Sequence, residues 1–139
     1  MATATITSFH QGGMSFNTEI SGHNVIIDTD KNGGGQNLGT RPKVLMLVSL
    51  AGCTGLDVVS ILNKQRVSFS QLSIEVNAHL TEEDPKIYDE VSVIYKIKVD
   101  KKDEPKVARA VQLSQDKYCG VSAMFRAFAK LSHRIEFIS

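Results

Sequence analysis

A long apolar segment begins at Pro42 and reads PKVLMLVSLAGCTGLDVVSILNK as far as Lys64. Proline suits the first turn of a helix, and a cation in the last turn complements the helix dipole. Apolar residues occur almost all round the helical wheel, which predicts a helix buried on every side. The expected helix has about 23 residues and a length near 35 Å. Such a helix is long for a chain of 139 residues, so we expect two copies to pack together in a homodimer.

The composition excludes several classes of protein. The chain has 16 Lys and Arg against 15 Asp and Glu, and no basic run exceeds two residues, so we expect no binding of nucleic acid. The longest apolar stretch, Val44 to Gly52, is shorter than the ~20 residues of a membrane span, so we expect no membrane association. The N-terminus lacks the basic and apolar segments of a secretory signal, which predicts a cytoplasmic protein with reduced thiols. The length suits a single domain over residues 1–139.

Alternating patterns on either side of the apolar segment predict β-strands. The expected strands are 6–9, 14–20 and 24–28 before it, and 71–80, 91–99 and 134–138 after it. Two helices should precede the last strand, the first with an apolar face from Val107 to Ser114 and the second from Val121 to about Ser132. Residues 30–40 contain three consecutive glycines without a phosphate-binding pattern, which predicts a plain loop. The element order predicts an α+β domain.

The two cysteines, Cys53 and Cys119, are the side chains best able to carry chemistry. A thiolate attacks electrophilic oxygen, and a second thiol within reach can close the product as a disulfide. Gly52 and Gly55 flank Cys53, and each costs about 1 kcal/mol relative to alanine inside a helix. That cost indicates close approach of another group, a kink, or room for a ligand beside the sulfur. The alternative is an inert core thiol beside glycines that serve helix packing.

Asp57 lies one helical turn after Cys53, so the two side chains share a face. A neighbouring carboxylate raises the pKa of a thiol unless a cation lies between them. The candidate cations are Arg41, Lys43, Arg66 and Arg126. The alternative is that Asp57 serves a local hydrogen-bond network. Four scattered histidines and two distant cysteines give no metal-ligand spacing, so we expect no metal and no cofactor.

Three stretches of this sequence stand out together: Arg41-Pro42 ahead of the apolar helix, SLAGCTGLDVVSIL at 49–62, and KYCGVS at 117–122. With them the chain resembles the OsmC/Ohr family, which is named for osmotic induction and organic hydroperoxide resistance. The resemblance is closest to the YhfA-like branch and covers nearly the whole chain. It implies an OsmC-like fold, in which two antiparallel sheets surround long central helices in an intertwined homodimer. The active sites would lie at the subunit interface.

The resemblance also implies a peroxidase that acts in oxidative-stress defence. Cys53 would match the peroxidatic cysteine, which attacks an organic hydroperoxide and becomes a sulfenic acid. Cys119 would match the resolving cysteine, which closes a disulfide with Cys53. A small dithiol such as dihydrolipoamide would then reduce that disulfide.

One departure from the family concerns the residues that tune the thiolate. Peroxidase members continue the proline with a glutamate that holds an activating arginine, whereas here Lys43 and Val44 follow Pro42. Arg41 is the only arginine before Cys53, so Arg41 and Lys43 are candidates for this role beside Asp57. The alternative function is a non-catalytic dimer that binds a hydrophobic or thiol-reactive small molecule.

Overall fold

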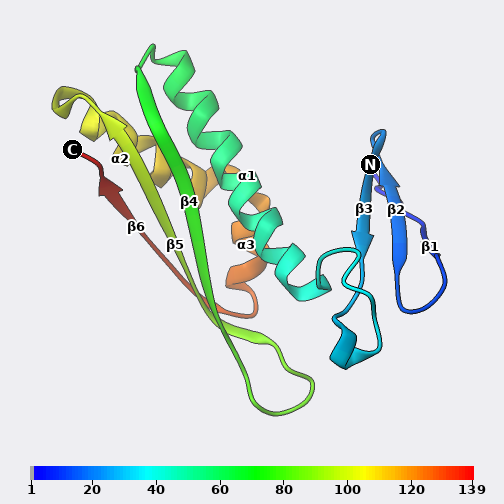
Figure 1. Cartoon of the computed structure of the whole chain (residues 1–139). Helices are drawn as coiled ribbons and strands as arrows, with labels where there is room; N and C mark the ends of the chain where they lie inside the picture. The colour runs from blue at the N-terminus through cyan, green and yellow to red at the C-terminus, as the bar shows by residue number, and fades with distance from the viewer. Residues whose placement is uncertain (1) are drawn as a thin grey trace. The chain divides into compact units, whose positions relative to one another are not determined.

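The computed structural model of the chain describes residues 2–139 and divides after Met46 into two compact units (Figure 1). The N-terminal unit contains a three-stranded antiparallel sheet in the order β1-β2-β3. Its strands are β1 (Ser8–His10), β2 (Phe16–Ile20) and β3 (His23–Ile27). The three short strands expected from the sequence are therefore confirmed. That the two units form a single domain remains a prediction.

Asp28 organises the loop that follows β3. Its buried carboxylate accepts the backbone N–H groups of Thr29, Gln36 and Leu38 at 2.7, 3.2 and 3.0 Å. The N–H of Leu38 is the largest cause that lowers the pKa of Asp28. A Cβ at Gly35 would collide with the carbonyl oxygen of Thr29, so only glycine lets the chain close around this carboxylate. The expected plain loop thus has a defined internal structure, including the 3-10 turn η1 (Lys31–Gly33).

Helix α1 (Pro42–Lys64) matches the predicted central helix. Its fully buried side chains follow one row of the helix and are Leu50, Thr54, Val58 and Leu62. The expectation of burial on every side is wrong for the single chain, because Val48 is 57% exposed and Leu56 is 75% exposed. Only one side of α1 packs against the core cluster of its unit.

Helix α1 is also long and apolar enough to cross a membrane by length and composition, with a mean hydropathy of 2.0 over 18 residues. The count of consecutive apolar residues from Val44 to Gly52 missed this, because isolated polar residues interrupt a segment that stays apolar as far as Leu62. A single helix of this kind is weak evidence for a membrane span, since the core helix of a soluble protein can have the same composition.

The C-terminal unit is built on a second sheet of order β4-β5-β6, with strands β4 (Phe69–Leu80), β5 (Tyr88–Val99) and β6 (Lys130–Phe137). Strands β4 and β5 are antiparallel, with Val76 opposite Val93, whereas β6 runs parallel to β5, with His133 opposite Val93. The expectation of antiparallel sheets is therefore wrong for β6. The connection from β5 to β6 contains two helices, and it is therefore long enough to cross over between two parallel strands.

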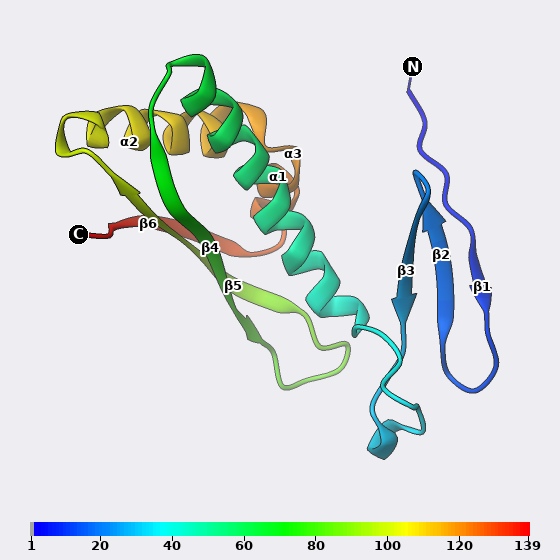
Figure 2. The ribbon, with the colours of Figure 1, turned by 45° about the horizontal axis from the view of Figure 1, so that its top comes forward.

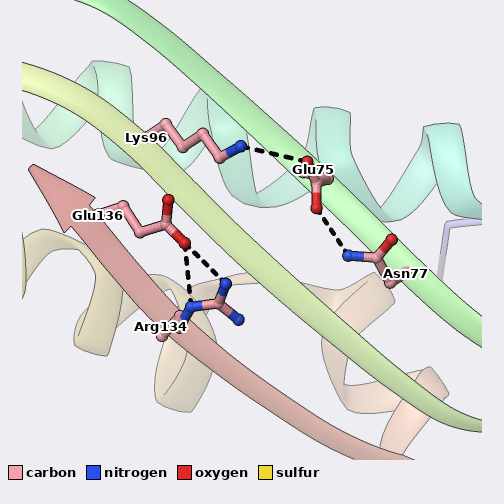
Figure 3. Close-up of polar contacts among 5 residues, drawn as sticks. All are labelled: Glu75, Asn77, Lys96, Arg134 and Glu136. Atoms are coloured by element: carbon pink, nitrogen blue, oxygen red, sulfur yellow. Dashed lines mark hydrogen bonds and ion pairs between the residues drawn. The ribbon is translucent and has the colours of Figure 1, made fainter. Parts of the chain in front are cut away.

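The two faces of this sheet differ: helices cover one, and exposed polar side chains lie on the other. Helices α1, α2 (Glu104–Leu113) and α3 (Gly120–Arg126) lie on one face (Figures 1 and 2). The opposite face carries exposed polar contacts, in which Lys96 and Asn77 donate to Glu75, and Arg134 donates to Glu136 (Figure 3). Such exposed pairs contribute little stability each. The core of the unit therefore lies between the sheet and the three helices.

The boundary between α3 and β6 differs from the prediction. Helix α3 ends at Arg126, not near Ser132, and β6 begins at Lys130 instead of residue 134. Residues 130–132 pair in register with Glu90, Val91 and Ser92 of β5. These ladder hydrogen bonds outweigh the helical spacing of the apolar residues before them, a spacing that does not by itself mark where a helix ends.

Candidate active site

The first turn of α3 brings the two thiols together. Cys53 projects from α1 and Cys119 caps the N-terminus of α3, and the two thiols are close enough that Cys119 raises the pKa of Cys53. The backbone N–H of Val121 lies near Cys53 and lowers the pKa of its thiol. The backbone N–H of Ser122 donates to the sulfur of Cys119 at 3.3 Å. The two N–H groups belong to the same helical turn, and both cysteines are free thiols.

A π-helical turn, Ser114–Tyr118, positions Cys119. The backbone N–H of Cys119 donates to the carbonyl oxygen of Ser114 at 2.8 Å, five residues earlier in the chain. The turn ends at Tyr118, and the next residue, Cys119, has an extended backbone with φ −79° and ψ 99°. Short π-helical segments occur often at functional sites. The sequence predicted only that Cys119 lies between two helices, and no pattern in residues 114–118 announces the π-helical turn.

The surroundings of Cys53 favour the neutral thiol. Burial is the largest cause that raises the pKa of Cys53, and the N–H of Val121 opposes it. The hydrogen bond and charge of Cys119 raise the pKa of Cys53 further, and so does the charge of Asp57. Asp57 thus acts in the direction expected of a carboxylate beside a thiol.

Asp57 is held by a hydroxyl group. The side chain of Ser114 donates to a carboxylate oxygen of Asp57 at 2.9 Å. Within residues 2–139, no Lys, Arg or His side chain lies within ion-pair distance of this carboxylate. The hydrogen-bond alternative considered for Asp57 is therefore what the geometry shows, while its tuning of the Cys53 thiolate stays a prediction.

A buried polar chain continues from Ser114 into the core. The hydroxyl groups of Ser114 and Thr54 lie 2.7 Å apart, and those of Thr54 and Tyr95 lie 2.6 Å apart. The side-chain amide of Gln115 donates to the Tyr95 hydroxyl at 2.6 Å. None of these four residues is more than 1% exposed. A tyrosine on the inward face of a strand needs a partner for its hydroxyl, so Tyr95 was the one sequence signal for this network.

The candidate cations have separate positions. Arg126 of α3 donates to the backbone carbonyl oxygen of Gln115 and to its side-chain oxygen at 3.2 Å. Arg41 donates to Asn37 at 2.8 Å and to the carbonyl oxygen of Gly39 at 3.0 Å, both in the N-terminal unit. Lys43 is exposed in the first turn of α1 and belongs to the same unit. Any action of Arg41 or Lys43 on Cys53 remains a prediction, whereas Arg126 joins the polar chain of the thiol site.

The two glycines beside Cys53 have different surroundings. A Cβ at Gly55 would lie 2.8 Å from the Cδ1 atom of Ile74, so this glycine lets β4 approach α1 closely. A Cβ at Gly52 would meet nothing within 4 Å. Gly55 is therefore explained by packing within the unit, and Gly52 lies on the open side of the helix.

A groove of about 470 Å³ runs along α1 beyond Asp57. Asp57, Lys64 and Tyr118 are among its lining residues. It thus reaches the residue one turn after Cys53 and the residue just before Cys119. Within the described part of the chain, no group of three or more His, Cys, Asp or Glu side chains is arranged to hold a metal ion.

Known proteins are similar to this chain in sequence and in fold. The family model described as OsmC-like protein matches residues 33–134. Protein YhfA of Escherichia coli strain K12 is 29% identical over 128 residues, which are 91% of this chain and 92% of YhfA. A hypothetical protein from Aquifex aeolicus VF5 is 28% identical, covers 100% of both chains and has a TM-score of 0.79. An organic hydroperoxide resistance protein OsmC from Legionella pneumophila is 17% identical, covers 98% of this chain and 99% of its own, and has a TM-score of 0.66. The mixed α+β fold expected from the sequence is confirmed by these neighbours.

Proposed function

The chain belongs to the OsmC-like protein family, and on that premise we propose that it is a thiol-dependent peroxidase that reduces organic hydroperoxides. The observation that carries the proposal is the pair of free thiols, Cys53 and Cys119, which lie close enough for Cys119 to affect the pKa of Cys53, with the backbone N–H groups of Val121 and Ser122 beside them. An inert core cysteine needs neither a second thiol nor such donors.

The chemistry has three balanced steps. The Cys53 thiolate attacks one peroxide oxygen, the O–O bond breaks, and an alcohol leaves once its oxygen takes a proton. The sulfur of Cys119 then attacks the resulting sulfenic acid, a disulfide forms and water leaves. A small dithiol such as dihydrolipoamide reduces that disulfide by thiol–disulfide exchange and becomes a cyclic disulfide. The N–H of Val121 stabilises negative charge on Cys53 in the first step.

The raised pKa of Cys53 sets the pH dependence of the first step. Only the thiolate is nucleophilic, so burial and the nearby Asp57 keep the reactive fraction small at neutral pH. Peroxide consumption should therefore rise steeply as the pH increases toward the pKa of the thiol.

The homodimer remains part of this proposal, and the surface of α1 supports it. Val44, Val48 and Leu56 are 48%, 57% and 75% exposed in the single chain. They lie along one row of the helix with Gly52 between them, which leaves room for another backbone to approach. Large exposed apolar surfaces of this kind mark interaction sites. A reducing compartment such as the cytoplasm fits the two free cysteines.

A second function is kept because two observations favour it. The pKa of Cys53 is raised, and Lys43 stands where peroxidase members carry glutamate. A dimer that binds a hydrophobic or thiol-reactive small molecule without reducing peroxide would have these properties.

The test is consumption of cumene hydroperoxide by the reduced protein with dihydrolipoamide as reductant. The Cys53→Ser variant should lose consumption, and Cys119→Ser should still make the sulfenic acid but fail to form the intramolecular disulfide. Equal rates in the parent and Cys53→Ser would refute the peroxidase and leave the binding function.

A further inference from the structure

In the buried polar chain beside the thiols, each hydrogen bond has a fixed donor and a fixed acceptor. A carboxylate only accepts hydrogen bonds, so the single proton of Ser114 points to Asp57. Thr54 must then donate to Ser114, and Tyr95 must donate to Thr54. Burial raises the pKa of Tyr95, which keeps this phenol protonated and able to donate.

The far end of the chain is fixed in the same sense. The oxygen of Tyr95 accepts from the amide nitrogen of Gln115, and the amide oxygen of Gln115 accepts from Arg126. The guanidinium group only donates, so it also sets which way the amide of Gln115 points. Every hydroxyl from Arg126 to Asp57 therefore uses its one proton, and no alternative orientation satisfies all of them.

The same chain ties both cysteines to the core. Thr54 follows Cys53 directly on α1, and Ser114 binds it through its side chain. The backbone carbonyl of Ser114 accepts the N–H of Cys119 at 2.8 Å. The π-helical turn before Cys119 is thus held by Thr54 from α1, by Tyr95 from β5 and by Arg126 from α3.

Placing four polar side chains in a core has a structural consequence. Thr54, Tyr95 and Ser114 are 0% exposed, and Gln115 is 1% exposed. Apolar residues would pack there without needing partners, whereas a satisfied polar network specifies one arrangement of the segments that it joins. The arrangement specified here is the position of Cys119 relative to Cys53.

We propose that the chain from Arg126 to Asp57 is a positioning device that holds Cys119 against Cys53 for disulfide closure. The proposal rests on the peroxidase function and adds Thr54, Tyr95, Ser114, Gln115 and Arg126 as positioning residues. Disulfide geometry tolerates only a narrow range of Cβ separations. Loosening the π-helical turn therefore slows the attack of Cys119 on the sulfenic acid of Cys53.

A slower closure has a distinct chemical result. A second hydroperoxide then oxidises the sulfenic acid to a sulfinic acid and leaves as the alcohol, and the enzyme is inactivated. The fraction of sulfinic acid per turnover reports the competition between the two reactions. A purely structural residue does not change this fraction while the protein stays folded.

The experiment uses three variants that remove one hydroxyl each: Thr54→Val, Tyr95→Phe and Ser114→Ala. The matched control is Val107→Ala, which removes core packing from a residue that is 1% exposed and outside the polar chain. Single-turnover mixing with cumene hydroperoxide measures formation of the sulfenic acid and its conversion to disulfide, and mass spectrometry measures sulfinic acid at Cys53.

We expect closure to slow at least about tenfold in Thr54→Val and Ser114→Ala, in line with the cost of small misplacements of reacting groups. The sulfinic fraction should rise in both variants, while Thr54→Val, which does not contact Asp57, forms the sulfenic acid at close to the parent rate and Val107→Ala closes normally. Normal closure in all three hydroxyl variants would overturn the proposal, as would equal slowing in Val107→Ala.

A second measurement separates this proposal from the peroxidase itself. The effective concentration of Cys119 toward Cys53 is measured in a glutathione redox buffer, which needs no peroxide. It should fall by about tenfold in Thr54→Val and stay unchanged in Val107→Ala. If the parent makes no sulfenic acid, the peroxidase fails, and this measurement still decides the positioning role. An unchanged effective concentration in Thr54→Val would refute it.

Discussion

Replacing Tyr95 by phenylalanine removes one oxygen from the centre of the buried polar chain. That oxygen accepts from Gln115 at 2.6 Å and shares a 2.6 Å hydrogen bond with Thr54. Without it, a Gln115 N–H loses its partner in a core where Gln115 is only 1% exposed. A buried donor left unpaired costs about 1–3 kcal/mol, and Thr54 keeps its bond to Ser114. We therefore expect the free energy of unfolding to fall by about 1–3 kcal/mol.

Urea unfolding at a fixed protein concentration measures this change. With a slope of about 1–3 kcal/mol per molar urea, the midpoint should fall by roughly 1 M at an unchanged slope. The matched control is Tyr118→Phe, because Tyr118 is 53% exposed and its ring lies beneath the ammonium group of Lys117. That variant should stay within about 0.5 kcal/mol of the parent. Equal midpoints for the Tyr95 variant and the parent would refute the directed polar chain.

Three further outcomes are expected. Burial and Asp57 raise the pKa of Cys53, so the rate of its alkylation by iodoacetamide should keep rising past pH 8. The Asp57→Asn variant should react faster than the parent at pH 7. A rate that reaches its plateau below pH 8 would contradict this prediction. Gly52→Leu should weaken self-association in sedimentation. A side chain at position 52 meets nothing within 4 Å in the single chain, but it would occupy the face of α1 that we assign to the dimer. An unchanged dimer would argue against that face. Folding lowers the pKa of Asp28. The ionised carboxylate therefore stabilises the folded state above the unfolded pKa of ~3.9, and this stabilisation is lost as the pH falls through the pKa of the folded state. Asp28→Asn should therefore destabilise the protein at pH 7 by urea unfolding, with a gap that narrows below about pH 4; a gap independent of pH would speak against the charge.

The sequence predicted those elements whose boundaries are marked by local chemistry. Pro42 and the basic end at Lys64 bound α1 as expected. Alternation located β4 and β5, because one face of each strand packs against the core and the other is polar. The pair of cysteines was also visible from the sequence, since the chain has only two and a thiolate is the strongest nucleophile among its side chains.

The missed features depend on contacts between distant segments. The π-helical turn has no pattern of its own, and its polar residues Ser114 and Gln115 are buried only because Thr54, Tyr95 and Arg126 provide partners. The predicted start of β6 was too late in the chain, because residues 130–132, which were expected in a helix, pair with β5. The parallel direction of β6 could have been inferred from the two helices between it and β5.

The product formed when one equivalent of cumene hydroperoxide is added to the reduced protein at pH 8 decides whether the two thiols act as a peroxidase. Peptide mass spectrometry without reduction should find a disulfide that joins Cys53 to Cys119, and one equivalent of cumyl alcohol should appear with it. Reduced thiols beside unconsumed hydroperoxide would refute the peroxidase, and the protein would then be a binding member of its family.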